Sequence, residues 1–138
     1  MSSRFEALPL TAEAFDGWNR FAEESDDAWF WHTTHWMEFT EELARPRFIA
    51  NLSFSIVANS ETLAICPLIL ERSSWSDESN RFSCASSPIP FPAMRSDLSS
   101  ETRNQLLKFY VQRLASLAKD HGVGHVSVRV PAVTRSYL

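Results

Sequence analysis

The chain has 138 residues, 44% of them hydrophobic and 22% charged, which is the length and composition of one compact domain spanning residues 1–138. Its net charge is −4, and it has no stripe of Lys and Arg, so DNA is not an expected partner. The N-terminus lacks the apolar segment of a signal peptide, and no apolar run is long enough to span a membrane. We therefore expect a cytoplasmic protein.

The two cysteines, Cys66 and Cys84, lie in apolar or strand-like runs. Neither belongs to a CxxC motif or a Cys/His pair, which are the spacings of metal and redox sites. Buried, reduced thiols that behave as small hydrophobic side chains are the favoured interpretation.

The first elements of the chain are predicted to be a strand and an amphipathic helix. Residues 3–8 favour a short strand, and Thr11 favours the start of a helix, with Leu10 and Phe15 placed as a hydrophobic staple. The acidic run at 23–27 should end this helix in a polar loop. A solvated loop is favoured there over a metal site.

The segment WFWHTTHWMEF, residues 29–39, is the most distinctive in the chain. Thr33 or Thr34 is expected to cap a helix that Arg45 and Pro46 end, because the residue before proline disfavours helical backbone. We expect an aromatic plug in the core, formed by Trp29 and Trp31 on one face of the entry segment and by Trp36, Phe39 and Leu43 on one face of the helix.

His32 and His35 within this segment could be a metal pair or a general base. Their spacing suits two ligands only if both are helical, and His32 is expected to precede the cap. No carboxylate or thiolate close in sequence completes a ligand set. A histidine hydrogen-bonded to the backbone at a helix start is therefore favoured, and no metal site is predicted.

The middle of the chain changes to a period of two residues. Alternation over 48–58 predicts a half-buried strand, 59–61 a turn, and the apolar run 62–72 a strand buried on both faces. Pro67 should mark a bulge or a splayed edge, since proline cannot donate to a ladder. A third strand is expected over 81–87.

The last third of the chain begins with the proline-rich segment SSPIPFPAM at 86–94. Its residues 88–92 should be extended and stiff, and an ordered loop that forms a pocket wall is favoured over a PxxP ligand. Serine caps near 99–101 and Gly122 bound a predicted helix. The final segment, 125–130, alternates as a strand.

This order of elements predicts an α/β (α+β) fold with a mixed sheet. Trp18 and Phe21, FWHTTHW at 30–36, LAICPLIL at 63–70 and SSPIPFP at 86–92 resemble the N-terminal half of FemAB-like acyltransferases, which are bacterial members of the GNAT superfamily. The resemblance implies a GNAT-like order, β-α-α-β-β-β-α-β, that stops before the last helix and strands. We expect a fragment of a longer two-domain chain, with the missing C-terminal domain or a partner chain covering the open sheet edge.

The resemblance also implies a function. The best-known members of the family move an amino acid from aminoacyl-tRNA onto a peptidoglycan precursor, and relatives use other acyl donors. This chain would then be the acceptor-side domain of a transferase acting on a cell-wall or polysaccharide precursor. A small-molecule acceptor would contact His32, Trp36, Pro90 and Arg95, since arginine can clamp a phosphate and tryptophan can stack on a sugar. No catalytic residue is expected, and the chain alone should be inactive.

No cofactor is expected in this chain, although the complete enzyme would use acyl-CoA or aminoacyl-tRNA. A GNAT domain holds the pyrophosphate of coenzyme A with the backbone N–H groups of a glycine-rich loop. The corresponding segment here, SSPIPFPAMRSDLSS, has no glycine and three prolines without an N–H.

A different class of function is also compatible with the sequence. The chain would then be a non-catalytic interaction domain that docks a partner by its open sheet edge and by the proline segment. A hydrolase is disfavoured, because the chain has no GxSxG or HExxH motif.

Overall fold

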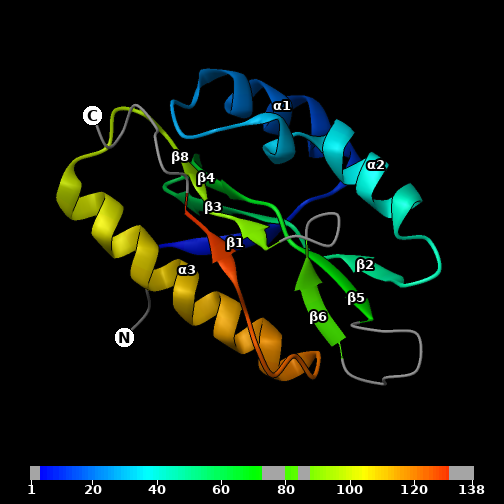
Figure 1. The fold of residues 1–138 in the computed structure, drawn as a ribbon. Helices are drawn as coiled ribbons and strands as arrows, with labels where there is room; N and C mark the ends of the chain where they lie inside the picture. The colour runs from blue at the N-terminus through cyan, green and yellow to red at the C-terminus, as the bar shows by residue number, and fades with distance from the viewer. Residues whose placement is uncertain (1–3, 73–79, 84–87, 131–138) are drawn as a thin grey trace.

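A computed structural model describes residues 4–72, 80–83 and 88–130 and arranges them in three layers (Figure 1). The middle layer is an antiparallel sheet of order β1-β3-β4-β8. Helix α3 lies on one face of this sheet, and helices α1 and α2 lie on the other (Figure 1). The predicted α/β class is therefore confirmed. The elements named here are β1 (Glu6–Pro9), α1 (Phe15–Glu24), α2 (Thr34–Leu43), β3 (Phe54–Ala58), β4 (Glu61–Cys66), β8 (Ala93–Met94) and α3 (Ser100–Asp120).

The two long strands predicted over 48–58 and 62–72 each break in the middle. Their outer halves are β2 (Phe48–Asn51) and β5 (Ile69–Arg72), which join β6 (Asn80–Ser83) in a second antiparallel sheet. Pro67 lies at the break, where its missing N–H is tolerated. The Ser53 hydroxyl there accepts a hydrogen bond from the backbone N–H of Leu68 at 2.9 Å. The buried N–H of Leu68 therefore has an acceptor even though the strand pairing breaks at this point.

The turn between β3 and β4 is a two-residue hairpin. Asn59 and Ser60 have φ angles of 51° and 65°, the left-handed pair that a type I′ turn requires. The predicted turn is therefore confirmed, although it lacks the usual Asn-Gly pair. It sets Glu61 opposite Ala58 at the start of β4.

The proline-rich segment is part of the sheets instead of a loop. Its first half, β7 (Ile89–Pro90), pairs in parallel with β9 (Val128–Arg129), and its second half, β8, pairs with β4. The extended backbone predicted for this segment is confirmed. The loop assignment is wrong, because Ile89 and Phe91 donate backbone hydrogen bonds to the 127–129 segment and most of the segment is buried.

The helix ends follow the sequence closely. The side chains of Thr33 and Ser99 each accept a backbone N–H three residues further on, as expected for N-caps. Gly122, with φ at 68°, ends α3 in the left-handed conformation. Thr11 precedes a short 3-10 turn, η1 (Ala12–Ala14), before α1 begins, and its side chain makes no cap hydrogen bond.

The hydrophobic core lies on both faces of the main sheet. Cys66 is a buried free thiol within it, as predicted, and burial raises the pKa of that thiol well above its ordinary value; Cys84 lies outside the described residues. The α3 side of the core contains Phe54, Ile56, Leu63, Leu106, Tyr110 and Leu114, and the α1–α2 side contains Trp18, Ala22, Met37, Ile65 and Ala93.

No helix in the described part of the chain is long and apolar enough to cross a membrane.

The aromatic plug predicted from residues 29–43 is wrong. Helix α2 turns its smaller side chains inward and leaves Phe39 and Leu43 52% and 59% exposed. In the short 3-10 turn before it, η2 (Phe30–His32), Phe30 is 60% exposed. The large apolar side chains of this region therefore lie at the surface, and we name them the aromatic face: Trp29, Phe30, Trp36, Phe39 and Leu43. The side chains that point inward are those of Thr34, Met37, Thr40 and, just after α2, Ala44.

Candidate functional site

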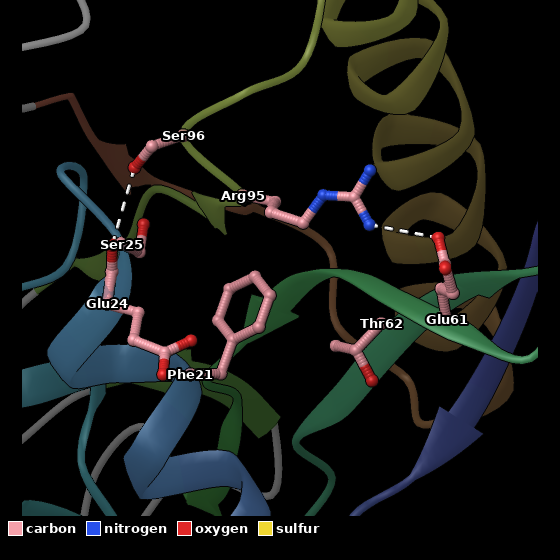
Figure 2. Close-up of a pocket in the computed structure, with 7 residues that line it drawn as sticks. All are labelled: Phe21, Glu24, Ser25, Glu61, Thr62, Arg95 and Ser96. Carbon is pink, nitrogen blue, oxygen red and sulfur yellow. Dashed lines mark hydrogen bonds and ion pairs between the residues drawn. The ribbon is translucent and has the colours of Figure 1, made fainter.

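A cavity of about 310 Å³ lies where the C-terminal end of α1, the start of β4 and the segment after β8 meet (Figure 2). We name it the Arg95 cavity. Figure 2 shows the guanidinium of Arg95 on one side, the ring of Phe21 between α1 and β4, and the carboxylate of Glu24 opposite. The lining residues are Phe21, Glu24, Ser25, Glu61, Thr62, Arg95 and Ser96.

Hydrogen bonds hold the three walls of this cavity together. The N–H of Arg95 donates to the Leu63 carbonyl at 2.9 Å, which continues the pairing of β8 with β4. Ser96 joins this segment to the end of α1, since its hydroxyl donates to the Glu24 carbonyl at 3.5 Å and accepts from the N–H of Asp26 at 2.9 Å. The cavity is therefore built from segments that lie far apart in the sequence.

Arg95 carries the positive charge of the cavity. Its Nε donates to Asp97 at 2.6 Å and its terminal NH1 donates to Glu61 at 3.1 Å. These hydrogen bonds raise the pKa of the guanidinium above its ordinary value, so Arg95 stays charged at every relevant pH. Within the described residues Arg95 has these two acceptors, so three of its five guanidinium N–H groups are left for a ligand.

The charges around the cavity do not favour a phosphate. Glu24, Glu61 and Asp97 place three carboxylates around the single guanidinium of Arg95. An anion would meet this excess of negative charge, whereas a neutral polyol or an amine would not. The aromatic ring of Phe21 and the hydroxyl of Thr62 complete a surface suited to a sugar, which has an apolar ring face and polar edges.

The acidic run at 23–27, beside the cavity, is only in part the solvated loop that the sequence predicts. Helix α1 ends within it as expected, and Glu23, Glu24 and Asp26 are exposed, but the other two residues are buried. Asp27 is buried, and its Oδ2 accepts from the N–H of Met94 at 3.2 Å and from Arg103 of α3 at 2.9 Å. Ser25 is also buried and donates to the Met94 carbonyl at 2.5 Å. This segment therefore ties α1 to β8 and α3, and it supports the floor of the Arg95 cavity.

His32, a predicted acceptor contact, is fully buried. Its Nδ1 accepts from the N–H of Trp29 at 2.9 Å, and its Nε2 is 2.8 Å from the Phe91 carbonyl. These partners require the neutral tautomer with the proton on Nε2, because an N–H can only donate and a carbonyl can only accept. The interpretation of His32 as a backbone-bonded histidine is confirmed, and both ring nitrogens are already engaged.

The other predicted contacts lie apart from one another. Trp36 is half-buried on α2, with its ring 5.6 Å from Phe30 and 5.1 Å from Phe39. Pro90 is buried in β7 beside β9. His32 reaches the proline segment through Phe91, but of the four predicted residues Arg95 alone lines the cavity.

The described residues contain no group of three or more His, Cys, Asp or Glu side chains that could hold a metal ion. Around the proline segment, the N–H groups of Ile89, Phe91 and Arg95 donate to backbone carbonyls and that of Met94 donates to Asp27. These four backbone donors are therefore engaged within the fold.

Sequence reasoning missed Phe21, Glu24, Glu61 and Thr62 as members of the site. The sequence predicts Phe21 to be an apolar residue on the inward side of an amphipathic helix. It predicts Glu24 to be part of a solvated loop and Glu61 to be a turn residue. Nothing in the local sequence pairs Glu61 with Arg95, which lies 34 positions further along the chain. The Asn59–Ser60 turn was a usable signal, since a tight hairpin places the next residue at the end of a sheet.

The described residues thus define a mixed α/β domain in which the charged, partly aromatic Arg95 cavity lies beside the main sheet. No family model, curated protein or solved structure matches the chain. The likeness to FemAB and GNAT acyltransferases consequently stays a prediction.

Proposed function

We propose that the chain is the acceptor-side domain of a cytoplasmic acyl- or aminoacyltransferase acting on a cell-wall or polysaccharide precursor. The layer order supports this, since α1 and α2 lie on one face of a mainly antiparallel sheet and α3 on the other. The parallel pairing of β7 with β9, which lie on either side of α3 in the sequence, also supports the proposal. The buried free thiol of Cys66 suits a reducing compartment.

The Arg95 cavity is the observation that carries the proposal. It places a guanidinium, carboxylates and an aromatic ring around a space of about 310 Å³. Carboxylates accept hydrogen bonds from sugar hydroxyls, Arg95 donates to sugar oxygens, and the ring of Phe21 packs against the apolar face of a pyranose. The acceptor part recognised here is then the saccharide, and the acyl donor, acyl-CoA or aminoacyl-tRNA, binds elsewhere in the complete enzyme.

Titration with N-acetylglucosamine, followed by NMR chemical shifts, tests this function. We expect shifts at Phe21, Thr62 and Arg95, and an affinity at least about tenfold lower in Arg95→Ala. Glucose 6-phosphate should bind more weakly than N-acetylglucosamine because of the surrounding carboxylates.

Arg45→Ala is the matched control, because Arg45 is an exposed arginine that pairs with Glu42 at the end of α2. It should bind N-acetylglucosamine as the unchanged protein does. Equal affinities in Arg95→Ala and Arg45→Ala, or no shifts at the cavity, would contradict the proposal.

The aromatic face favours a second candidate function, a protein-interaction domain. Clusters of exposed large apolar side chains are uncommon on monomers and mark interaction surfaces. The docking surface would then be α2 and η2, whereas the proline segment proposed from the sequence is largely buried. Glu38, Glu41 and Glu42 are exposed on the same helix, so charge complementarity selects a partner segment that is both apolar and basic.

A synthetic amphipathic helix of leucine and lysine is the probe for this second function. It should shift the tryptophan fluorescence to the blue, and a helix with glutamate in place of lysine should not. The double variant Phe39→Ser/Leu43→Ser should lower the affinity about tenfold. Val111→Ser, which removes an equally exposed apolar side chain from α3, is the control. Equal binding of both peptides would exclude this candidate.

A further inference from the structure

The Arg95 cavity is one end of a longer groove. A second cavity, of about 250 Å³, shares Phe21 and Thr62 with it. A third, of about 540 Å³, shares Pro9, Ser55 and Thr62 with the second. Because each cavity has lining residues in common with the next, the three are neighbours in a row along the α1 side of the main sheet, and we name this row the groove.

The floor of this groove is polar where it crosses the sheet. Ser55 of β3 and Thr62 of β4 are both half-buried and line the second and third cavities. Their hydroxyl groups can each donate and accept hydrogen bonds. Apolar side chains, among them Leu8, Leu10 and Ile65, line the same two cavities. The groove therefore offers both polar and apolar contacts, which suit the edges and faces of sugar rings.

The side chains that line the groove carry more negative than positive charge in total. Glu6, Glu13, Glu24 and Glu61 line it, against the two arginines Arg4 and Arg95. An acidic polymer such as a polyuronate or a nucleic acid would be repelled. A neutral or amine-bearing chain would not.

Gly17 lies in the first turn of α1 and lines the second cavity. A Cβ at this position would meet no atom within 4 Å, so no neighbouring side chain of the fold requires a glycine here. Its φ lies in the ordinary range of a helix, so the backbone does not require a glycine either. Glycine nevertheless weakens a helix relative to alanine. What the missing side chain provides is open space between α1 and the sheet, directly over the groove.

We propose that the groove binds a linear, non-acidic oligosaccharide whose terminal ring occupies the Arg95 cavity and whose further rings pass beneath Gly17 towards β1. This inference rests on the proposed saccharide function and adds the length of the ligand. Gly17 is the position at which the chain of sugars approaches α1 most closely.

The test compares N-acetylglucosamine with its β-1,4-linked tetramer in the unchanged protein and in Gly17→Leu. We expect the tetramer to bind at least about tenfold more tightly than the monosaccharide in the unchanged protein. Gly17→Leu should remove this gain and leave monosaccharide binding unchanged. Leucine is a better helix former than glycine, so denaturation should show a variant at least as stable as the parent, which excludes misfolding as the cause.

Gly124→Leu is the matched control, because Gly124 also has open space around its Cβ position but lines none of the three cavities. Equal affinity for monosaccharide and tetramer, or tetramer binding that Gly17→Leu does not weaken, would overturn the inference and leave the proposed function standing. Absence of binding by both sugars would overturn both.

Discussion

Replacing Asp27 by alanine is expected to lower the free energy of unfolding by about 3 kcal/mol. The side chains of Asp27 and Arg103 are 6% and 21% exposed, and their N···O distance is 2.9 Å. The substitution leaves the Arg103 guanidinium without this partner in a largely buried place and removes the acceptor of the Met94 N–H. Urea denaturation followed by tryptophan fluorescence measures the change.

Glu23→Ala is the matched control for Asp27, since Glu23 is an exposed carboxylate on the last turn of α1. Its unfolding free energy should stay within about 0.5 kcal/mol of the parent. Arg103→Met should destabilise as Asp27→Ala does, and the double variant should cost less than the two single changes added together. A loss below about 1 kcal/mol in Asp27→Ala would show that the buried pair does not support the cavity floor.

Acidification is expected to destabilise the protein through His32. Burial lowers the pKa of this imidazole below 6.5, and the hydrogen bonds with Phe91 and Trp29 only partly oppose that effect. The unfolded chain, with an ordinary pKa, takes up the proton first as the pH falls. The contribution of His32 is therefore complete above pH 6.5 and is lost as the pH falls from there towards the lowered pKa, by at most about 1.4 kcal/mol per pH unit.

The substitution His32→Gln removes this titration, because a glutamine side chain does not ionise, and it keeps one donor and one acceptor. His32→Gln should be less stable than the parent at pH 8, by about 1 to 3 kcal/mol for imperfect hydrogen bonds, but its unfolding free energy should fall less steeply between pH 7 and 5. His35→Gln, a change at an exposed histidine of α2, should keep the parent slope. Parallel slopes for the parent and His32→Gln would contradict the expected effect.

The sequence predicts most of the fold because its signals for the ends of elements are local. Thr33 and Ser99 cap helices by bonds within three residues, and Gly122 closes α3 by its own backbone angle. Pro67 breaks a strand because of a property of one residue. Each of these features needs no knowledge of distant parts of the chain.

The aromatic face shows where such reasoning ends. The helical spacing of Trp36, Phe39 and Leu43 correctly predicts that they lie on one side of α2. The same spacing cannot predict whether that side packs against the core or faces solvent. The opposite side, with Met37 and Thr40, is the buried one. Hydrophobicity alone favours the wrong side. A large apolar face turned outward conflicts with the usual pattern, and such conflicts are expected at functional surfaces.

The candidate site escaped prediction for a related reason. Arg95 is predicted as an acceptor contact from the resemblance and because arginine can clamp a phosphate. Its partner Glu61 and the ring of Phe21 come from different elements, and only the pairing of β4 with β8 and the position of α1 bring them together. Long-range pairing of this kind leaves no periodic trace in a single sequence.

The contacts of Asp27 also bear on the kinetics of folding. They join residues 67 and 76 positions apart, so we expect them to form after the central hairpin and α3 have come together, because such long loops are entropically costly to close early. Interactions that form after the transition state slow unfolding without accelerating folding. We therefore expect changes at Asp27 and Arg103 to alter mainly the unfolding rate, and changes at the Asn59–Ser60 hairpin to alter mainly the folding rate.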